Sequence, residues 1–255
     1  MTNIWIILRK ELRSYFVSPV AYLLLTMFGL IFGFFFWNAV GYFNLMGLES
    51  QMRGGGMPMN INEQVIRPLL SNVSVIGLFF IPMMTMRLFA EEKRTGTIEL
   101  LATSPIRDIE VILGKWLAAM ALYACMLLFT ALNFAFLFRF GNPDWKPLAI
   151  GYLGLLLQAG GLLAIGTFIS TLTRNQIIAG AATFGVCLML WVLEWVSGYE
   201  TAAWAKVVAY MSVITHFESF SKGIIDSKDA VFYVSVIFLG LFLTSRSMES
   251  LRWRS

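Results

Sequence analysis

The feature of this sequence that most constrains its fold is a set of six long runs without Asp, Glu, Lys or Arg. The runs lie between Arg13 and Glu49, Arg67 and Arg87, Lys115 and Arg139, Lys146 and Arg174, Arg174 and Glu194, and Asp229 and Arg246. The first five contain 19 to 35 residues each, and about 20 helical residues cross the hydrocarbon core of a bilayer. The sequence therefore predicts an all-α polytopic membrane protein with six transmembrane helices, in a single domain over residues 1–255.

The sixth run is the shortest. It has 16 uncharged residues, which cover only about 24 Å as a helix. We expect it to span if Lys228, Asp229 and Arg246 lie at the two membrane interfaces, where the longer side chains reach toward head groups.

The composition and the distribution of charge fit a membrane protein with a defined orientation. Only 13% of the residues are charged and the mean hydropathy is +0.73, whereas about a quarter of a soluble domain is charged. With the N-terminus inside, twelve of the 19 Lys and Arg residues fall on the inner side. The positive-inside rule then places both termini in the cytoplasm. Lipid head groups account for the net charge of +4, so we expect no nucleic-acid partner.

Two segments flank the predicted spans. Residues 1–16 place apolar side chains on one helical arc beside three basic residues, which indicates a helix in the cytoplasmic interface. The alternative is an amphipathic helix packed on a protein core. The first 13 residues carry four charges, so we expect no cleavable signal peptide. Residues 197–229 are too long for a hairpin, and Trp204, Val207, Val208 and Met211 recur at helical spacing. They predict an external re-entrant or interfacial helix pair before the last span.

A charged run, FAEEKRTGTIELLATSPI, occupies residues 89–106 between the second and third apolar runs. The orientation makes it a short cytoplasmic connector. Thr97 is expected to cap a brief amphipathic helix, and Ser104 and Pro105 are expected to begin the next one. Such a helix on the membrane surface would provide a binding site for a soluble protein.

Other candidate features have mainly structural interpretations. Pro82 is expected to kink the second span. Cys125 and Cys187 lie in apolar runs, where a thiol behaves as a small hydrophobe. His216, with Glu218 nearby, suggests proton or metal chemistry, but a lone histidine is more often a hydrogen-bonded structural residue. Methionines around the glycine-rich residues 53–59 suggest Cu(I) binding, against the simpler interpretation of flexible loop filler.

The charged run and the residues directly after it, FAEEKRTGTIELLATSPIRDIEVILGKWLA (residues 89–118), resemble the signature around the first cytoplasmic loop of ABC-2-type export permeases. In that family an EEK.TGT.E.L...P segment forms the coupling helix, which docks into a groove of the ATPase subunit. LRKELRSYFVSPVAYL (8–23) and ITHFESFSKGIIDSKDAVFYV (214–234) are most similar to the branch associated with gliding motility and nitrous-oxide maturation.

The resemblance implies partners and site residues. The ATPase contact would be formed by Glu91, Glu92, Arg94, Gly96, Thr97 and Glu99. The partners would be a cytoplasmic P-loop ABC ATPase dimer, which carries the ATP and Mg, and a second permease copy or paralogue in the bacterial inner membrane. The first and fifth spans would meet at the permease interface, where the small-xxx-small pair Gly29 and Gly33 allows helices to approach closely.

The chain itself has no sequence expected of an enzyme. It lacks the G-x-x-x-x-G-K-[ST] loop that binds ATP phosphates, so the ATPase activity must reside in a separate subunit and this chain needs no cofactor of its own. Its apolar runs also lack the ionisable groups of a membrane enzyme or a secondary transporter. We expect a permease subunit of an exporter. The alternative is a mechanical subunit that relays ATPase motion to a periplasmic accessory protein without substrate passage.

Overall fold

The structure, a computed structural model, describes residues 2–52, 60–98, 106–199 and 203–252. These residues form helices joined by short turns, and no β-strand occurs among them. The helices are α1 (Thr2–Val17), α2 (Pro19–Met52), η1 (Asn62–Ile66), α3 (Arg67–Thr85), α4 (Ala90–Thr95), α6 (Asp108–Phe140), α7 (Trp145–Leu172), α8 (Gln176–Tyr199), α9 (Ala203–Tyr210), α10 (Val213–Ser221) and α11 (Ser227–Arg252).

Six helical segments are long and apolar enough to cross a membrane, which confirms the predicted number. They contain α2, α3, α6, α7, α8 and α11. Helix α11 extends beyond the short sixth run at both of its ends, because Lys228, Asp229 and Arg246 all lie within the helix. Its 26 residues cover about 39 Å, enough to cross the hydrocarbon core.

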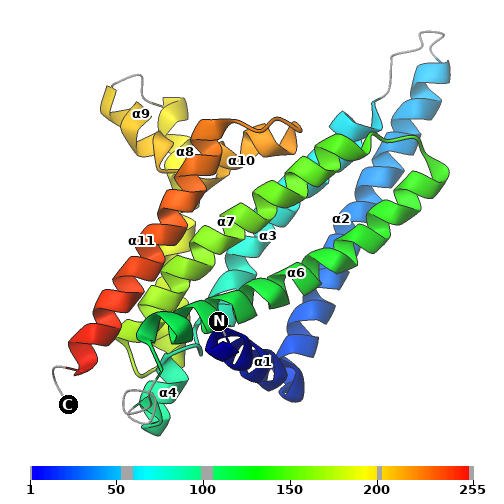
Figure 1. Cartoon of the computed structure of the whole chain (residues 1–255). Helices are drawn as coiled ribbons and strands as arrows, with labels where there is room; N and C mark the ends of the chain where they lie inside the picture. The colour runs from blue at the N-terminus through cyan, green and yellow to red at the C-terminus, as the bar shows by residue number, and fades with distance from the viewer. Residues whose placement is uncertain (1, 53–59, 99–105, 200–202, 253–255) are drawn as a thin grey trace.

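Helices α3 and α7 form the centre of the bundle (Figure 1). In the most apolar stretch of each span, 72% of the residues are buried in the α3 segment and 56% in α7, against 22% in α2, α8 and α11. Helix α7 packs against α3, α6, α8, α10 and α11. The peripheral spans therefore keep broad apolar faces for lipid or for another helix.

The bundle has two distinct ends. Helices α1 and α4 and the C-terminal part of α11 lie at one end, and α9 and α10 lie at the other (Figure 1). We call these the α4 end and the α10 end. Helices α3, α6, α7 and α11 run from one end to the other. A side chain near the end of one of these spans therefore lies at the α4 end or at the α10 end.

Small residues bring the central helices close together. A Cβ atom on Gly166 of α7 would lie 2.4 Å from Oγ1 of Thr85 in α3. A Cβ atom on Gly240 of α11 would lie 2.8 Å from the carbonyl carbon of Ala164 in α7. Both distances are shorter than van der Waals contact, so these helix pairs depend on the missing side chain.

Helix α1 packs on the protein more than the sequence analysis expects. Two apolar side chains of α1, Ile7 and Tyr15, are buried. A Cβ atom on Gly114 of α6 would lie 2.7 Å from Cγ2 of Ile7, so α1 and α6 are in intimate contact. Trp5, Ile6 and Val17 are exposed and are apolar side chains of α1 that face away from the bundle.

The expected pair of helices before the last span is present as α9 and α10. Helix α10 is packed into the bundle, with Phe217 and Phe220 buried. A Cβ atom on Gly154 of α7 would lie 2.5 Å from Cβ of Phe220. On α9, Trp204 and Val207 are exposed, which is typical of an interfacial helix.

His216 is a hydrogen-bonded structural residue. Its Nδ1 lies 2.7 Å from Oδ1 of Asp229 in α11, and its Nε2 lies 2.8 Å from the carbonyl oxygen of Tyr210 in α9. The imidazole is 3% exposed and stacks on Phe232 with ring centroids 3.9 Å apart. His216 therefore joins α9, α10 and α11 at the α10 end.

Candidate functional site

The charged run between the second and third spans begins with a helix of its own. Helix α3 passes through Pro82 and ends at Thr85, and α4 starts five residues later at Ala90. Gly96 ends α4 in the left-handed conformation at φ 75°, which favours glycine because other side chains are strained there. The sequence predicts a brief helix after Thr97, and most of that expected helix falls within residues 99–105, outside the described residues.

Ser170, near the end of α7, caps α4. Its Oγ accepts hydrogen bonds from the backbone N–H groups of Phe89 and Ala90, both at 3.1 Å, and donates to the carbonyl oxygen of Met86 at 3.3 Å. Phe89, Ala90 and Ser170 are all fully buried. A hydroxyl from another span thus satisfies N–H groups that a helix start leaves without partners.

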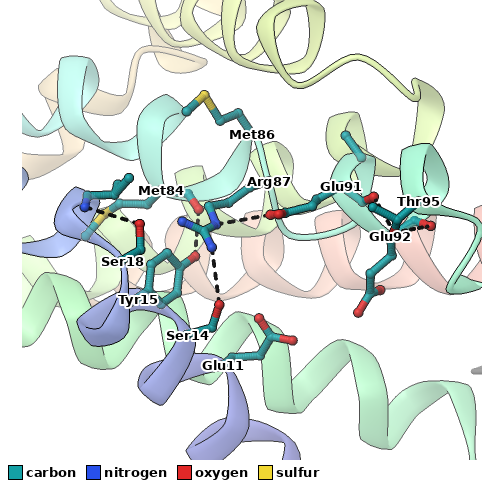
Figure 2. Close-up of polar contacts among 12 residues, drawn as sticks. Glu11, Ser14, Tyr15, Ser18, Met84, Met86, Arg87, Glu91, Glu92 and Thr95 are labelled. Atoms are coloured by element: carbon teal, nitrogen blue, oxygen red, sulfur yellow. Dashed lines mark hydrogen bonds and ion pairs between the residues drawn. The ribbon is translucent and has the colours of Figure 1, made fainter.

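Arg87 connects the turn before α4 to α1 (Figure 2). Its guanidinium donates to Oγ of Ser14 at 3.2 Å, lies 3.4 Å from the Glu91 carboxylate and sits 5.3 Å from the centre of the Tyr15 ring. An arginine suits this place, because its planar group can stack on a ring while its edge donates hydrogen bonds.

Tyr15 fixes the same corner from inside. Its hydroxyl donates to the carbonyl oxygen of Met84 at 2.7 Å, a bond that Figure 2 shows beneath Arg87. Burial raises the pKa of Tyr15 far above its ordinary value, so the hydroxyl stays protonated and keeps donating. Since Met84 lies in the last turn of α3, Tyr15 ties the end of that span to α1.

A second ionic cluster lies deeper, around Lys115 of α6. Its Nζ lies 2.9 Å from Oε1 of Glu11 in α1 and 2.9 Å from Oε1 of Glu92 in α4. The lysine side chain is 2% exposed, and those of Glu11 and Glu92 are 14% and 13% exposed. Nζ also lies 5.2 Å from the centre of the Phe89 ring. One ammonium therefore joins three helices.

The described residues of the charged run, the predicted coupling residues among them, divide into inward and outward groups. Glu91 pairs with Arg87, Glu92 pairs with Lys115, and Lys93 donates to the carbonyl oxygen of Thr171 in α7. The outward group consists of the exposed residues Arg94, Thr95, Gly96 and Thr97. Thr95 and Thr97 share a hydrogen bond between their hydroxyls at 3.0 Å. Glu99 lies outside the described residues.

The start of the third span differs from the prediction. Helix α6 begins at Asp108 with Arg107 as its N-cap, so Ser104 and Pro105 are not its cap and first residue. The Glu110 carboxylate accepts from the Arg107 backbone at 3.3 Å and from the Asn3 amide at 3.0 Å. An acidic residue in the first turn also suits the positive end of the helix dipole.

Gly29 and Gly33, predicted for a permease interface, lie on α2. A Cβ atom on Gly29 would meet the Phe129 ring of α6 at 3.8 Å, an ordinary contact. A Cβ atom on Gly33 would have nothing within 4 Å. Gly33 therefore leaves an open place on α2, whereas Gly29 is partly covered within the chain.

The comparisons with known proteins assign the family. Residues 5–222 match the model of the ABC-2 family transporter protein. The chain belongs to the ABC-2 family. It is also similar to the probable multidrug ABC transporter permease YbhR of Escherichia coli K12 and to that of Escherichia coli O157:H7. Each is 24% identical over 165 residues, which are 63% of this chain and 43% of the relative. The chain thus aligns with less than half the length of these curated relatives.

The α4 end of this ABC-2 chain contains no metal-ligating cluster of three or more His, Cys, Asp or Glu among the described residues. Its groups instead form a polar framework. Two other buried ionisable side chains, His216 and Asp229, lie at the α10 end. The described spans therefore keep their buried charges near helix ends, where the cost of placing them in a membrane protein is lowest.

Sequence reasoning missed the two residues that place α4 in this ABC-2 chain. In the sequence, Lys115 marks the edge of an apolar run, and Ser170 is part of another run. Lys115 could have been identified, because a lysine within a membrane helix needs a counter-charge. The structure places it inside α6, with seven residues of helix before it. Nothing in the local sequence marks Ser170.

Proposed function

We propose that this chain is the membrane permease subunit of an ABC exporter of the bacterial inner membrane. The α4 end faces the cytoplasm, and the exposed residues Arg94 to Thr97 form a contact for a separate P-loop ATPase dimer, which binds the ATP and Mg. The observation that carries the proposal is α4 itself, a six-residue helix held by side chains and backbone groups of α6 and α7 with one edge left to solvent. The family assignment and the similarity to a permease support it.

A charge reversal on the exposed edge tests the docking contact. We expect Arg94→Glu to abolish co-purification with the partner ATPase, because rim charges set docking register and specificity. Membrane insertion and thermal stability should be unchanged, since Arg94 is exposed. The matched control is Arg139→Glu at the α10 end, which is also exposed and should leave co-purification intact. Undiminished co-purification of Arg94→Glu would contradict the proposal.

The orientation is tested separately by cysteine labelling. A Thr97→Cys variant, in a background with Cys125 and Cys187 replaced by Ala, should react with an impermeant maleimide only after the membrane is opened. Labelling of intact cells would place α4 outside and overturn both the orientation and the docking contact.

We further propose that two permease copies, or this chain and a paralogue, pair through α2 and α8. Both spans are mostly unburied within one chain, and Gly33 offers the open place on α2. We expect Gly33→Leu to weaken self-association, measured by cross-linking in membranes. Ser235→Leu, on an exposed position of α11, is the control. Equal association of both variants with the unmodified chain would count against this seam.

A mechanical relay is the second candidate, and one feature favours it. Helix α7 contacts α4 through Ser170 at one end and α10 through Gly154 at the other. A displacement of α4 can therefore reach the outer helices through a single rigid element, which would serve a periplasmic accessory protein. The two functions differ in reconstituted vesicles, where an exporter moves a substrate when ATP is hydrolysed and a relay hydrolyses ATP without moving one.

A further inference from the structure

The ionic cluster of Lys115 has an unequal number of charges. One buried ammonium faces two carboxylates, Glu11 and Glu92, at the same distance of 2.9 Å. In addition, Oε2 of Glu92 is buried and has no hydrogen-bond partner among the described residues. Two carboxylates thus compete for one ammonium, and Glu92 is the one with an unused oxygen.

We propose that Lys115 is a positioning residue that holds α4 as a releasable latch, in which Glu11 remains bound when Glu92 leaves. The proposal deepens the coupling function and rests on the docking role proposed for α4. The latch describes how α4 moves after a soluble partner has bound its exposed edge.

Packing decides which carboxylate stays. Glu11 lies on α1, which contacts α6 so closely that a Cβ atom on Gly114 would lie 2.7 Å from Ile7. Glu92 lies on α4, whose only fully buried residue is Ala90. The α1 and α6 helices therefore move together, whereas α4 is joined to α6 by the Lys115–Glu92 pair and can separate from it.

The second carboxylate also lowers the cost of release. Removing one partner of an ordinary buried ion pair strands the other charge in a medium of low polarity, which is strongly unfavourable. Here Glu11 stays beside the ammonium when Glu92 departs, so Lys115 is never left without a counter-charge. Glu92, moving outward at the end of the bundle, gains water. Contacts from α7 to α4 through Ser170 and Lys93 remain as a pivot.

The latch predicts opposite effects of two similar substitutions. Glu92→Gln removes the charge that holds α4, so hydrogen exchange of the α4 amides should become about tenfold faster. Glu11→Gln makes Glu92 the sole counter-charge of Lys115, so the same amides should exchange at least about threefold more slowly. A purely structural cluster predicts faster exchange in both. The control Glu249→Gln breaks the exposed pair with Arg246 in α11 and should leave hydrogen exchange of the α4 amides unchanged.

The experiment is exchange mass spectrometry on the full chain in nanodiscs, over peptides that contain residues 89–98. Faster exchange in both variants, or no change in Glu92→Gln, overturns the latch. Co-purification of the partner ATPase, measured on the same samples, reports separately on the docking role. Opposite exchange effects with unaltered ATP hydrolysis by the bound partner would support the latch and overturn the coupling function.

Discussion

Removing the hydroxyl of Ser170 is the sharpest test of how α4 is placed. In Ser170→Ala, the backbone N–H groups of Phe89 and Ala90 lose the acceptor that lies 3.1 Å from each. Water cannot easily replace it, since all three residues are fully buried. A buried donor without a partner costs about 1–3 kcal/mol, and two donors lose this acceptor. We therefore expect α4 to be less stable by at least about 2 kcal/mol.

The loss should be local, so the assay must resolve segments. A change of 1.4 kcal/mol is tenfold in an equilibrium constant, and 2 kcal/mol is about thirtyfold. Exchange of the amides of α4 should accelerate by at least about that factor if they exchange through local opening. Amides in the middle of α7 should keep their protection, because Ser170 lies in the last turn of that helix.

Ser235→Ala is the matched control. The Ser235 hydroxyl donates to the carbonyl oxygen of Val231 at 2.7 Å on an exposed part of α11. Its removal leaves no N–H group without an acceptor, so exchange should stay within about twofold. If the α4 amides of Ser170→Ala also stay within twofold of the unmodified chain, the capping argument is refuted and α4 must be held by its ion pairs alone.

Three further predictions concern other parts of the bundle. Gly240→Ala should lower the free energy of unfolding by about 1–3 kcal/mol relative to Gly185→Ala, because only at Gly240 does a Cβ atom meet the backbone of α7; urea titration in detergent measures both. Tyr15→Phe should cost about 1 kcal/mol, since it removes the bond to the end of α3, and unchanged thermal stability would contradict this. For His216→Asn and Asp229→Asn, a double-mutant cycle should give a coupling energy of about 0.5–3 kcal/mol, whereas additive losses would rule out a direct interaction.

The spans could be predicted from the sequence because each depends on its own composition. A helix can cross a membrane when enough consecutive residues are apolar. This requirement concerns only the segment itself and does not depend on the rest of the chain. The helices α9 and α10 were predictable for a similar reason, from the spacing of residues such as Trp204 and Val207. The orientation of α1 was not, because the arc that contains Tyr15 is apolar whether it faces lipid or the protein.

The candidate site depends on residues that are far apart in the sequence. Glu11, Glu92 and Lys115 meet only after α1, α4 and α6 have packed. The motif alone marked Glu92 as a contact for another protein, and its side chain instead points to Lys115. The exposed edge that begins at Arg94 could be separated from the inward residues only with the structure.

The way α4 is attached explains why a six-residue helix can serve as a handle. A helix this short has little stability of its own, and Ala90 is its only fully buried residue. Directional polar contacts from α6 and α7 supply what packing cannot, and they fix one orientation of the exposed edge. The Lys115–Glu92 pair can also be exchanged for water without exposing a large apolar face. A force applied at the edge therefore reaches α7 through Ser170 while the apolar core between the spans stays closed.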